Sequence, residues 1–118
     1  EKAMESMRNI ASHNLHGTTA NIVFKTSYPP MEPTKANYAL LGKLEEINIA
    51  LGYGELEALD PSKRGAADIS FVAPHVDASL AGMGPDGFGD HSDNEGLDLS
   101  SFAKTTSRAA ILIYRLTR

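Results

Sequence analysis

Apolar residues recur at helical spacing in three segments, and each segment predicts an amphipathic helix. The first covers residues 1–14, the second begins at Thr34 and ends near Gly52, and the third begins at Asp98. Thr and Asp are favoured as helix N-caps, and Gly is favoured just beyond a helix end. The positions expected to face inward are Met4, Met7, Ile10 and Ala11 in the first helix, Leu41, Leu44, Ile47 and Leu51 in the second, and Phe102, Ala109, Leu112, Ile113 and Leu116 in the third.

Between these helices, other apolar patterns predict strands. Residues 19–25 alternate and contain branched side chains, residues 56–59 suggest a short strand, and residues 76–83 are typical of a buried strand. Residues 66–73 are apolar and predict a short helix or a turn. From Thr34 onward, helices and strands therefore alternate, which favours an α/β fold with helices packed on a mainly parallel sheet.

A proline-rich stretch separates the first helix and strand from the rest. Three prolines occur within residues 27–33, and such a segment favours an extended, semi-rigid connector. We therefore expect a boundary here, with residues 1–33 forming one unit with its connector and residues 34–118 forming another.

Composition excludes some functions. The chain has 118 residues, 42% hydrophobic and 22% charged, which are globular values. A net charge of −4 argues against nucleic acid as a partner, and no apolar run has the length of a membrane span. There is no cysteine, so any metal would be held by His and carboxylates. The sequence starts at Glu1 without a methionine, which suggests a piece of a longer protein, and it predicts no compartment.

The loop at residues 82–96 is the first candidate site. It contains five glycines, four acids and His91, and it follows the carboxyl end of a predicted strand, where α/β sheets collect ligands. His91 could be a zinc-type ligand, or it could be an exposed loop histidine bonded to a nearby Asp. Counted from Asp86 or Asp90, the loop fails the EF-hand positions, so a solvated acidic turn is favoured over a calcium site.

Arg64 and Asp68 are the second candidate pair. Small residues lie between them, and Arg is the preferred side chain for clamping a carboxylate. The alternative is that Asp68 caps the following short helix and Arg64 is a surface charge. His13 and His16 lie near a predicted helix end, where they would be solvated or capping, and His75 precedes a predicted strand.

Several segments together resemble one family. Residues 65–71 (Gly-Ala-Ala-Asp-Ile-Ser-Phe), 82–85 (Gly-Met-Gly-Pro), 89–91 (Gly-Asp-His) with Glu95, and 113–116 (Ile-Tyr-Arg-Leu) look like the C-terminal part of M20-type metallopeptidases. This family includes glutamate carboxypeptidases and aminoacylases. Residues 1–33 are similar to the last helix and strand of its α+β lid, or dimerisation, domain and to the connector into the catalytic domain.

The resemblance implies a role for each candidate residue. His91 would be a ligand of one of two zinc ions that activate a shared water, and Asp68 and Arg64 would line the substrate pocket. The substrate would be a small peptide or an N-acyl amino acid cleaved beside a free carboxylate, and the parent enzyme would be a homodimer.

The chain also departs from the family. Such enzymes carry a His-x-Asp pair, a bridging aspartate and a Glu-Glu pair upstream of the part that this chain resembles, and Ala67 stands where some members have a threonine. We therefore expect a C-terminal fragment with no catalytic residue of its own, inactive alone. The alternative from a different class is a small non-enzymatic α/β interaction or oligomerisation module with an acidic loop.

Overall fold

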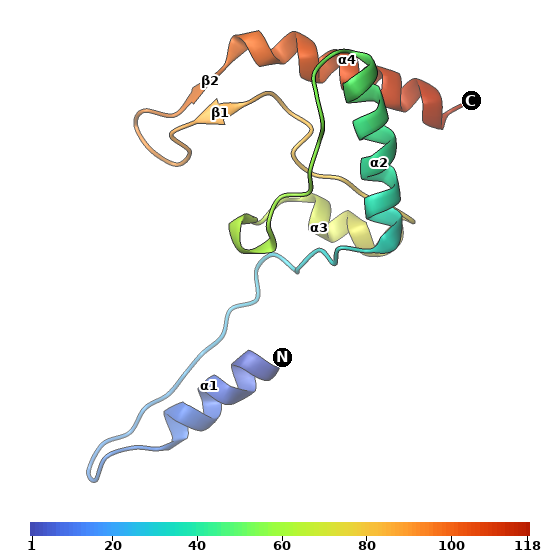
Figure 1. The fold of residues 1–118 in the computed structure, drawn as a ribbon. Helices are drawn as coiled ribbons and strands as arrows, with labels where there is room; N and C mark the ends of the chain where they lie inside the picture. Colours follow the sequence, from blue (N-terminus) through green and yellow to red (C-terminus); the bar gives the residue numbers. More distant parts are fainter.

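The computed structural model describes the backbone of residues 1–118 and every side chain except that of Pro61. In chain order the elements are α1 (Lys2–Ser12), α2 (Lys35–Ala50), the 3-10 turn η1 (Pro61–Lys63), α3 (Ile69–Val72), the 3-10 turn η2 (Ala73–His75), β1 (Gly87–Phe88), β2 (Gly96–Leu97) and α4 (Leu99–Leu116) (Figure 1). The molecule measures 66 × 37 × 20 Å with a radius of gyration of 20.0 Å. A compact domain of this length would have a radius of gyration of about 13 Å, so the chain is far from compact.

The only extensive packing between helices in the described chain joins α2 to α4. The side chain of Thr34 accepts a hydrogen bond from the Asn37 N–H at 3.1 Å and starts α2, and Asp98 does the same for α4 through the Ser100 N–H at 2.9 Å. These caps confirm both predicted helix starts. The core between the helices consists of Leu44, Ile47 and Leu112, with partly buried Leu40, Leu51, Leu56, Leu80, Met83 and Ile111 packed against it.

The face that α4 buries differs from the predicted one. Its buried residues are Ser101, Thr105, Arg108 and Leu112. Phe102 is 54% exposed, Ile113 is 63% exposed and Leu116 is 49% exposed, so the prediction that they face inward was wrong. The physical reason is that α2 covers one side of α4, and no other helix or strand of the described chain covers the other.

The sheet is much smaller than predicted. β1 and β2 form an antiparallel pair with Gly87 opposite Leu97 and Phe88 opposite Gly96. The segments 19–25, 56–59 and 76–83 run without regular secondary structure and have no strand partner within the described residues. A strand is stabilised by its neighbours, so apolar alternation alone does not form one. The parallel sheet stays a prediction, because its strands would need partners outside these residues.

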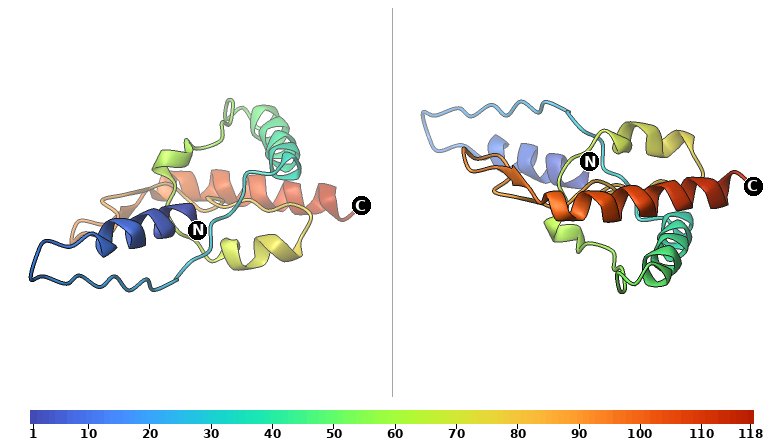
Figure 2. Two further views of the ribbon diagram at one scale, coloured as in Figure 1. Left: turned by 90° about the horizontal axis from the view of Figure 1, so that it is seen from below. Right: turned by 90° about the horizontal axis from the view of Figure 1, so that it is seen from above.

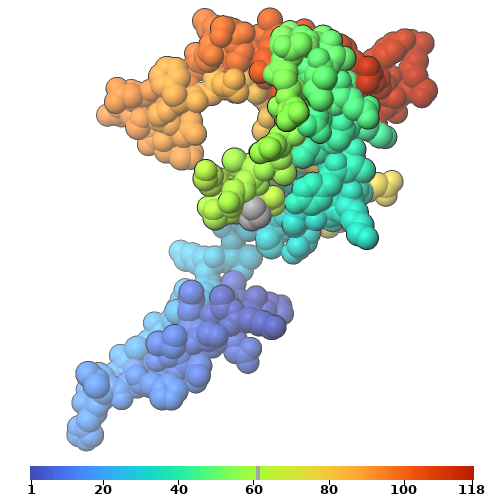
Figure 3. Space-filling model, in the orientation of Figure 1, coloured from blue at the N-terminus to red at the C-terminus, as the bar shows by residue number. Residues whose placement is uncertain are grey.

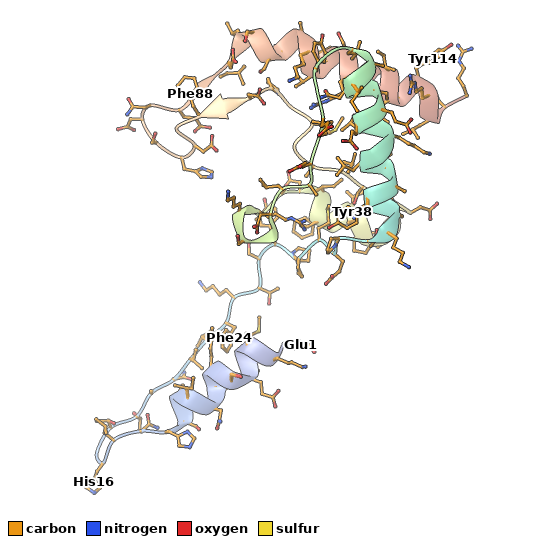
Figure 4. The ribbon with its side chains drawn as sticks, viewed as in Figure 1. Glu1, His16, Phe24, Tyr38, Phe88 and Tyr114 are labelled. Atoms are coloured by element: carbon orange, nitrogen blue, oxygen red, sulfur yellow. The ribbon has the colours of Figure 1, made fainter. Side chains whose placement is uncertain are left out.

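An N-terminal arm, residues 1–27, extends away from the rest of the chain (Figures 1 and 2). α1 confirms the first predicted helix, yet it buries no residue and contacts no other helix or strand. Inside the arm, the guanidinium of Arg8 lies 5.0 Å from the centre of the Phe24 ring, and Figure 4 shows Phe24 beside α1. The arm is therefore held together by contacts within itself.

Hydrogen bonds anchor the connector, residues 28–33, to the body of the molecule. The Tyr28 hydroxyl donates to Asp68 at 3.0 Å, and the Ser79 hydroxyl donates to the sulfur of Met31 at 3.6 Å. Asn37 joins the two sides, because its side-chain N–H donates to the Glu32 carbonyl at 3.0 Å and its side-chain oxygen accepts from the Ser79 N–H at 2.9 Å. The connector thus belongs structurally to the body, and the free chain ends just before Tyr28.

Candidate functional site

His91 lies in the turn between β1 and β2, exposed to solvent. Its φ of 62° is positive, as is that of Gly89 at 68°, and the Ser92 hydroxyl donates to the Gly89 carbonyl at 2.6 Å. A positive φ is uncommon outside glycine, so the turn holds His91 in a defined backbone conformation. Among the described residues, no three His, Cys, Asp or Glu side chains gather closely enough to hold a metal. This chain therefore offers His91 as a single candidate ligand.

Two glycines determine the shape of the turn that carries His91. A Cβ added to Gly96 would lie 2.4 Å from the Phe88 ring, so the ring packs directly on the glycine backbone. A Cβ on Gly89 would lie 2.7 Å from the Asn94 carbonyl oxygen. Figure 4 shows the labelled Phe88 on this hairpin. Gly89 therefore requires glycine, because it combines a positive φ with a close approach to the Asn94 backbone, whereas Gly96 makes room for the end of the Phe88 side chain.

Asp68 interacts with the connector rather than with its own helix. It occupies the N-cap position of α3 but makes no capping hydrogen bond with its side chain. Its carboxylate accepts the hydrogen bond from the Tyr28 hydroxyl, and this bond, together with the negative charge, raises the pKa of Tyr28. The Tyr28 ring also lies 5.2 Å from the Phe71 ring at a tilt of 55°. Asp68 therefore occupies the predicted N-cap position of α3, but its side chain does not cap the helix.

Arg64 lies on the wall of an open cavity. Its Nε donates to the Leu59 carbonyl at 3.1 Å, which turns the side chain back along the preceding segment. In the same turn, hydrogen bonds from Ser62 lower the pKa of Asp60. Arg64 forms no hydrogen bond or ion pair with Asp68 in the described structure. The two predicted substrate-binding residues therefore do not form a joint binding site here.

The cavity has a volume of about 1050 Å³. It lies between α2, the connector and the segments 56–59, 64–70 and 79–83, and Arg108 of α4 also contributes to its wall. Figure 3 shows an opening in the molecule between the segment around residue 55 and the segment before β1. His91 and Asp68 do not line it, whereas Arg64 does.

Arg108 is the residue that the sequence analysis missed. It is 7% exposed, its Nη1 donates to the Asn48 side-chain oxygen at 3.3 Å, and its buried Nε has no partner. The sequence contains a signal for it, since Ser101, Thr105, Arg108 and Leu112 are spaced by four, three and four residues and so share one helix face. A cation in the middle of such a stripe suggests that the face is not simply apolar.

Comparison with models of known protein families, with characterised proteins and with solved structures finds no match to this chain. The structure does not bring His91, Arg64 and Asp68 together. His91 lies on the hairpin, Arg64 on the cavity wall and Asp68 beside the connector. None of the described helices is both long and apolar enough to cross a membrane.

Proposed function

We propose that this chain is the C-terminal part of an M20-type di-zinc hydrolase that cleaves an amide or peptide bond next to a free carboxylate. The observation that carries the proposal is the order of four short motifs, at residues 65–71, 82–85, 89–91 and 113–116. Each motif is short, and their common order and spacing give the resemblance its specificity. The substrate class would be small peptides or N-acyl amino acids, and the parent enzyme would act as a homodimer.

The sparse packing supports the idea that these residues belong to a larger domain. Only Leu44, Ile47 and Leu112 are buried apolar residues among those described, in a chain of 118 residues. Folding a chain of this size has a conformational entropy cost on the order of 100 kcal/mol or more, so a core this small leaves the isolated chain only marginally stable. The apolar segments 56–59 and 79–83 also lie unpaired against the cavity. Further chain would complete the core and pair these segments.

The donor set does not hold zinc by itself. A zinc site needs at least three protein ligands, and the described residues offer His91 without two companions. In the parent enzyme, metal would lower the pKa of a bound water and polarise the scissile carbonyl. The contribution of this chain would be the imidazole of His91 as one ligand, positioned by the glycine-dependent turn, and Arg64 and Asp68 near the substrate pocket.

The proposal is tested first on the chain as it stands. The 118-residue polypeptide should hydrolyse no dipeptide or N-acyl amino acid, with or without added zinc, because it lacks a general base and most ligands. Saturable, metal-dependent turnover by the purified chain would contradict this account.

The decisive experiment uses the full-length parent. His91→Ala should lower kcat by several orders of magnitude, on the order of 10³-fold or more, and release one metal ion per subunit while the fold is retained. His75→Ala, which changes a histidine outside the motifs, is the matched control and should leave metal content unchanged. Normal metal content and turnover in His91→Ala would leave His91 as a loop histidine.

The alternative is a non-enzymatic interaction module. Its specific support is the exposure of large apolar residues on α4, where Phe102 is 54% exposed and Ile113 is 63% exposed. Sequencing the chain upstream of Glu1 separates the two proposals. His-x-Asp and Glu-Glu patterns there would favour the hydrolase, and a native start at Glu1 would favour the module.

A further inference from the structure

We propose that the cavity beside α2 docks an extended polypeptide segment that presents a carboxylate to Arg108. The inference rests on the proposed function for the source of the segment, which would be a strand from the remaining part of the parent's catalytic domain. The docking chemistry itself follows from Arg108 and from the unpaired segments on the cavity wall.

Arg108 is a buried cation. The residue is 7% exposed, and the one hydrogen bond of its guanidinium goes to the neutral amide of Asn48. The Nε–H donor is buried and unpartnered, and no ion pair of Arg108 occurs in the described structure. A buried cation without a counter-charge is costly, so an acceptor is missing from its surroundings.

A carboxylate is the acceptor that suits Arg108. Guanidinium offers parallel N–H donors in a fixed fork that matches the two oxygens of a carboxylate. The cavity wall that includes Arg108 also includes Leu44, Leu80 and Met83, so few competing polar groups adjoin the guanidinium there. Of the acidic residues in the chain, Glu32 and Glu57 lie on the cavity wall, and neither pairs with Arg108. The geometry therefore favours a carboxylate that enters from outside this chain.

The backbone along the cavity is also unpaired. Residues 56–59 and 79–83 lie on the cavity wall without strand partners among the described residues. In the described structure their backbone N–H groups make two hydrogen bonds, from Leu56 to Glu45 at 3.4 Å and from Ser79 to Asn37 at 2.9 Å. Backbone groups facing a partly closed, apolar space are normally paired, and a strand added along such a segment pairs them.

The charge of the arm disfavours the arm of a second copy as the occupant. The arm's extended segment, residues 19–25, is the extended part of this chain that lies outside the body. It contains Lys25 and no acid, so it would bring a second cation toward Arg108 instead of a carboxylate. The preferred occupant is a segment of alternating apolar residues with one Asp or Glu facing the cavity.

The test is a titration of the 118-residue chain, followed by NMR. The probe is an acetylated and amidated peptide of alternating valine and threonine with one central aspartate, and its matched partner has asparagine in that position. We expect the aspartate peptide to shift the amide signals of residues 56–59 and 79–83 and the Nε–H signal of Arg108. It should bind at least about tenfold more tightly than the asparagine peptide, because a charge-assisted bond replaces a neutral one.

Two variants test whether Arg108 causes the preference for the aspartate peptide. Arg108→Met should remove the discrimination between the two peptides, whereas Arg115→Met, which removes an exposed cation from the same helix, should keep it. Equal binding of both peptides by the unaltered chain would overturn the proposal without depending on the folding of any variant. A retained preference in folded Arg108→Met would overturn it too, as would concentration-dependent dimerisation with protection of the same segments, which would assign the cavity to a second copy.

These outcomes are separate from those of the hydrolase proposal. The peptide titration requires no metal and no turnover. Preferential binding of the aspartate peptide could therefore be observed even if the protein is not a hydrolase. Conversely, loss of metal in full-length His91→Ala would stand even if neither peptide bound.

Discussion

The α2–α4 pair and the N-terminal arm both contain helices that were predicted from apolar residues at helical spacing, with opposite results. Both α1 and α2 have apolar residues at helical spacing, yet α2 buries Leu44, Ile47 and Asn48 while α1 buries no residue. On α1, Ile10 is 73% exposed. An amphipathic pattern thus predicts that a helix has a face to bury, and only a neighbouring element turns that face into stability.

The helix starts show the same difference. Thr34 caps α2 with its side chain, whereas Glu1 at the start of α1 makes no capping hydrogen bond with its side chain. We therefore expect the body to unfold cooperatively and the arm to open locally at lower free energy.

The largest expected effect comes from removing the centre of the small core. Ile47 is 1% exposed, and Ile47→Ala should lower the free energy of unfolding by about 2–5 kcal/mol through lost burial and a cavity. Urea denaturation followed by circular dichroism measures it. Ile49→Ala is the control, because Ile49 is 52% exposed on the same helix and should change stability by roughly 0.5 kcal/mol or less. Equal losses in the two variants would mean that no specific core exists.

A smaller effect is expected from the cap of α2. Thr34→Ala removes the acceptor for the Asn37 N–H and should cost about 1 kcal/mol. The control is Thr106→Ala, an exposed threonine within α4, where alanine is the better helix former and stability should not fall. Thermal melting of both variants decides the point, and an unchanged midpoint in Thr34→Ala would show that packing alone sets the helix start.

Removal of the arm should change the body least. A chain that begins at Ser27 keeps the Tyr28 contacts, so its free energy of unfolding should stay within roughly 0.5 kcal/mol of the full chain. In limited trypsin digestion of the full chain, cleavage after Lys25 should precede cleavage after Lys43 of α2. A large loss of stability would reveal contacts between the arm and the body.

A pH titration tests the hydrogen bond between Tyr28 of the connector and Asp68. The hydrogen bond from Tyr28 to Asp68 raises the pKa of the Tyr28 hydroxyl. The stabilisation is therefore complete below the pKa of tyrosine in the unfolded chain, about 10, and is lost as the pH rises through the higher pKa of the folded chain. NMR titration of the Tyr28 ring should show this pKa falling toward the ordinary value in Asp68→Ala. An identical titration curve in that variant would place the anchor elsewhere.

The sequence predicted the helices well because their signals are local. The capping residues Thr34 and Asp98 and the glycine after α2 act within one turn of chain. The strands were harder to predict, because residues 56–59 and 76–83 have strand-like patterns but no strand partner among the described residues, and pairing is not a local property.

For the candidate sites, too, local features were predictable from the sequence, whereas contacts between distant residues were not. The unusual turn around His91 was predictable from its glycines, but the proposed role of His91 as a zinc ligand requires further ligands, which the described residues do not bring to it. The partner of Asp68 could not be predicted, since Tyr28 lies 40 residues away along the chain. Arg108 was detectable from its place on the polar stripe of α4, although its missing counter-charge became visible only in three dimensions.

Asn48 has a consequence for the order of folding. Its amide N–H donates to the Gly54 carbonyl six residues away, at 2.8 Å, and its amide oxygen accepts from Arg108 sixty residues away, at 3.3 Å. The first bond closes a short loop and can form within the turn after α2, whereas the second waits until a long stretch of chain has come together. We therefore expect a single side chain to report two stages of the folding reaction, an early one at its nitrogen and a late one at its oxygen.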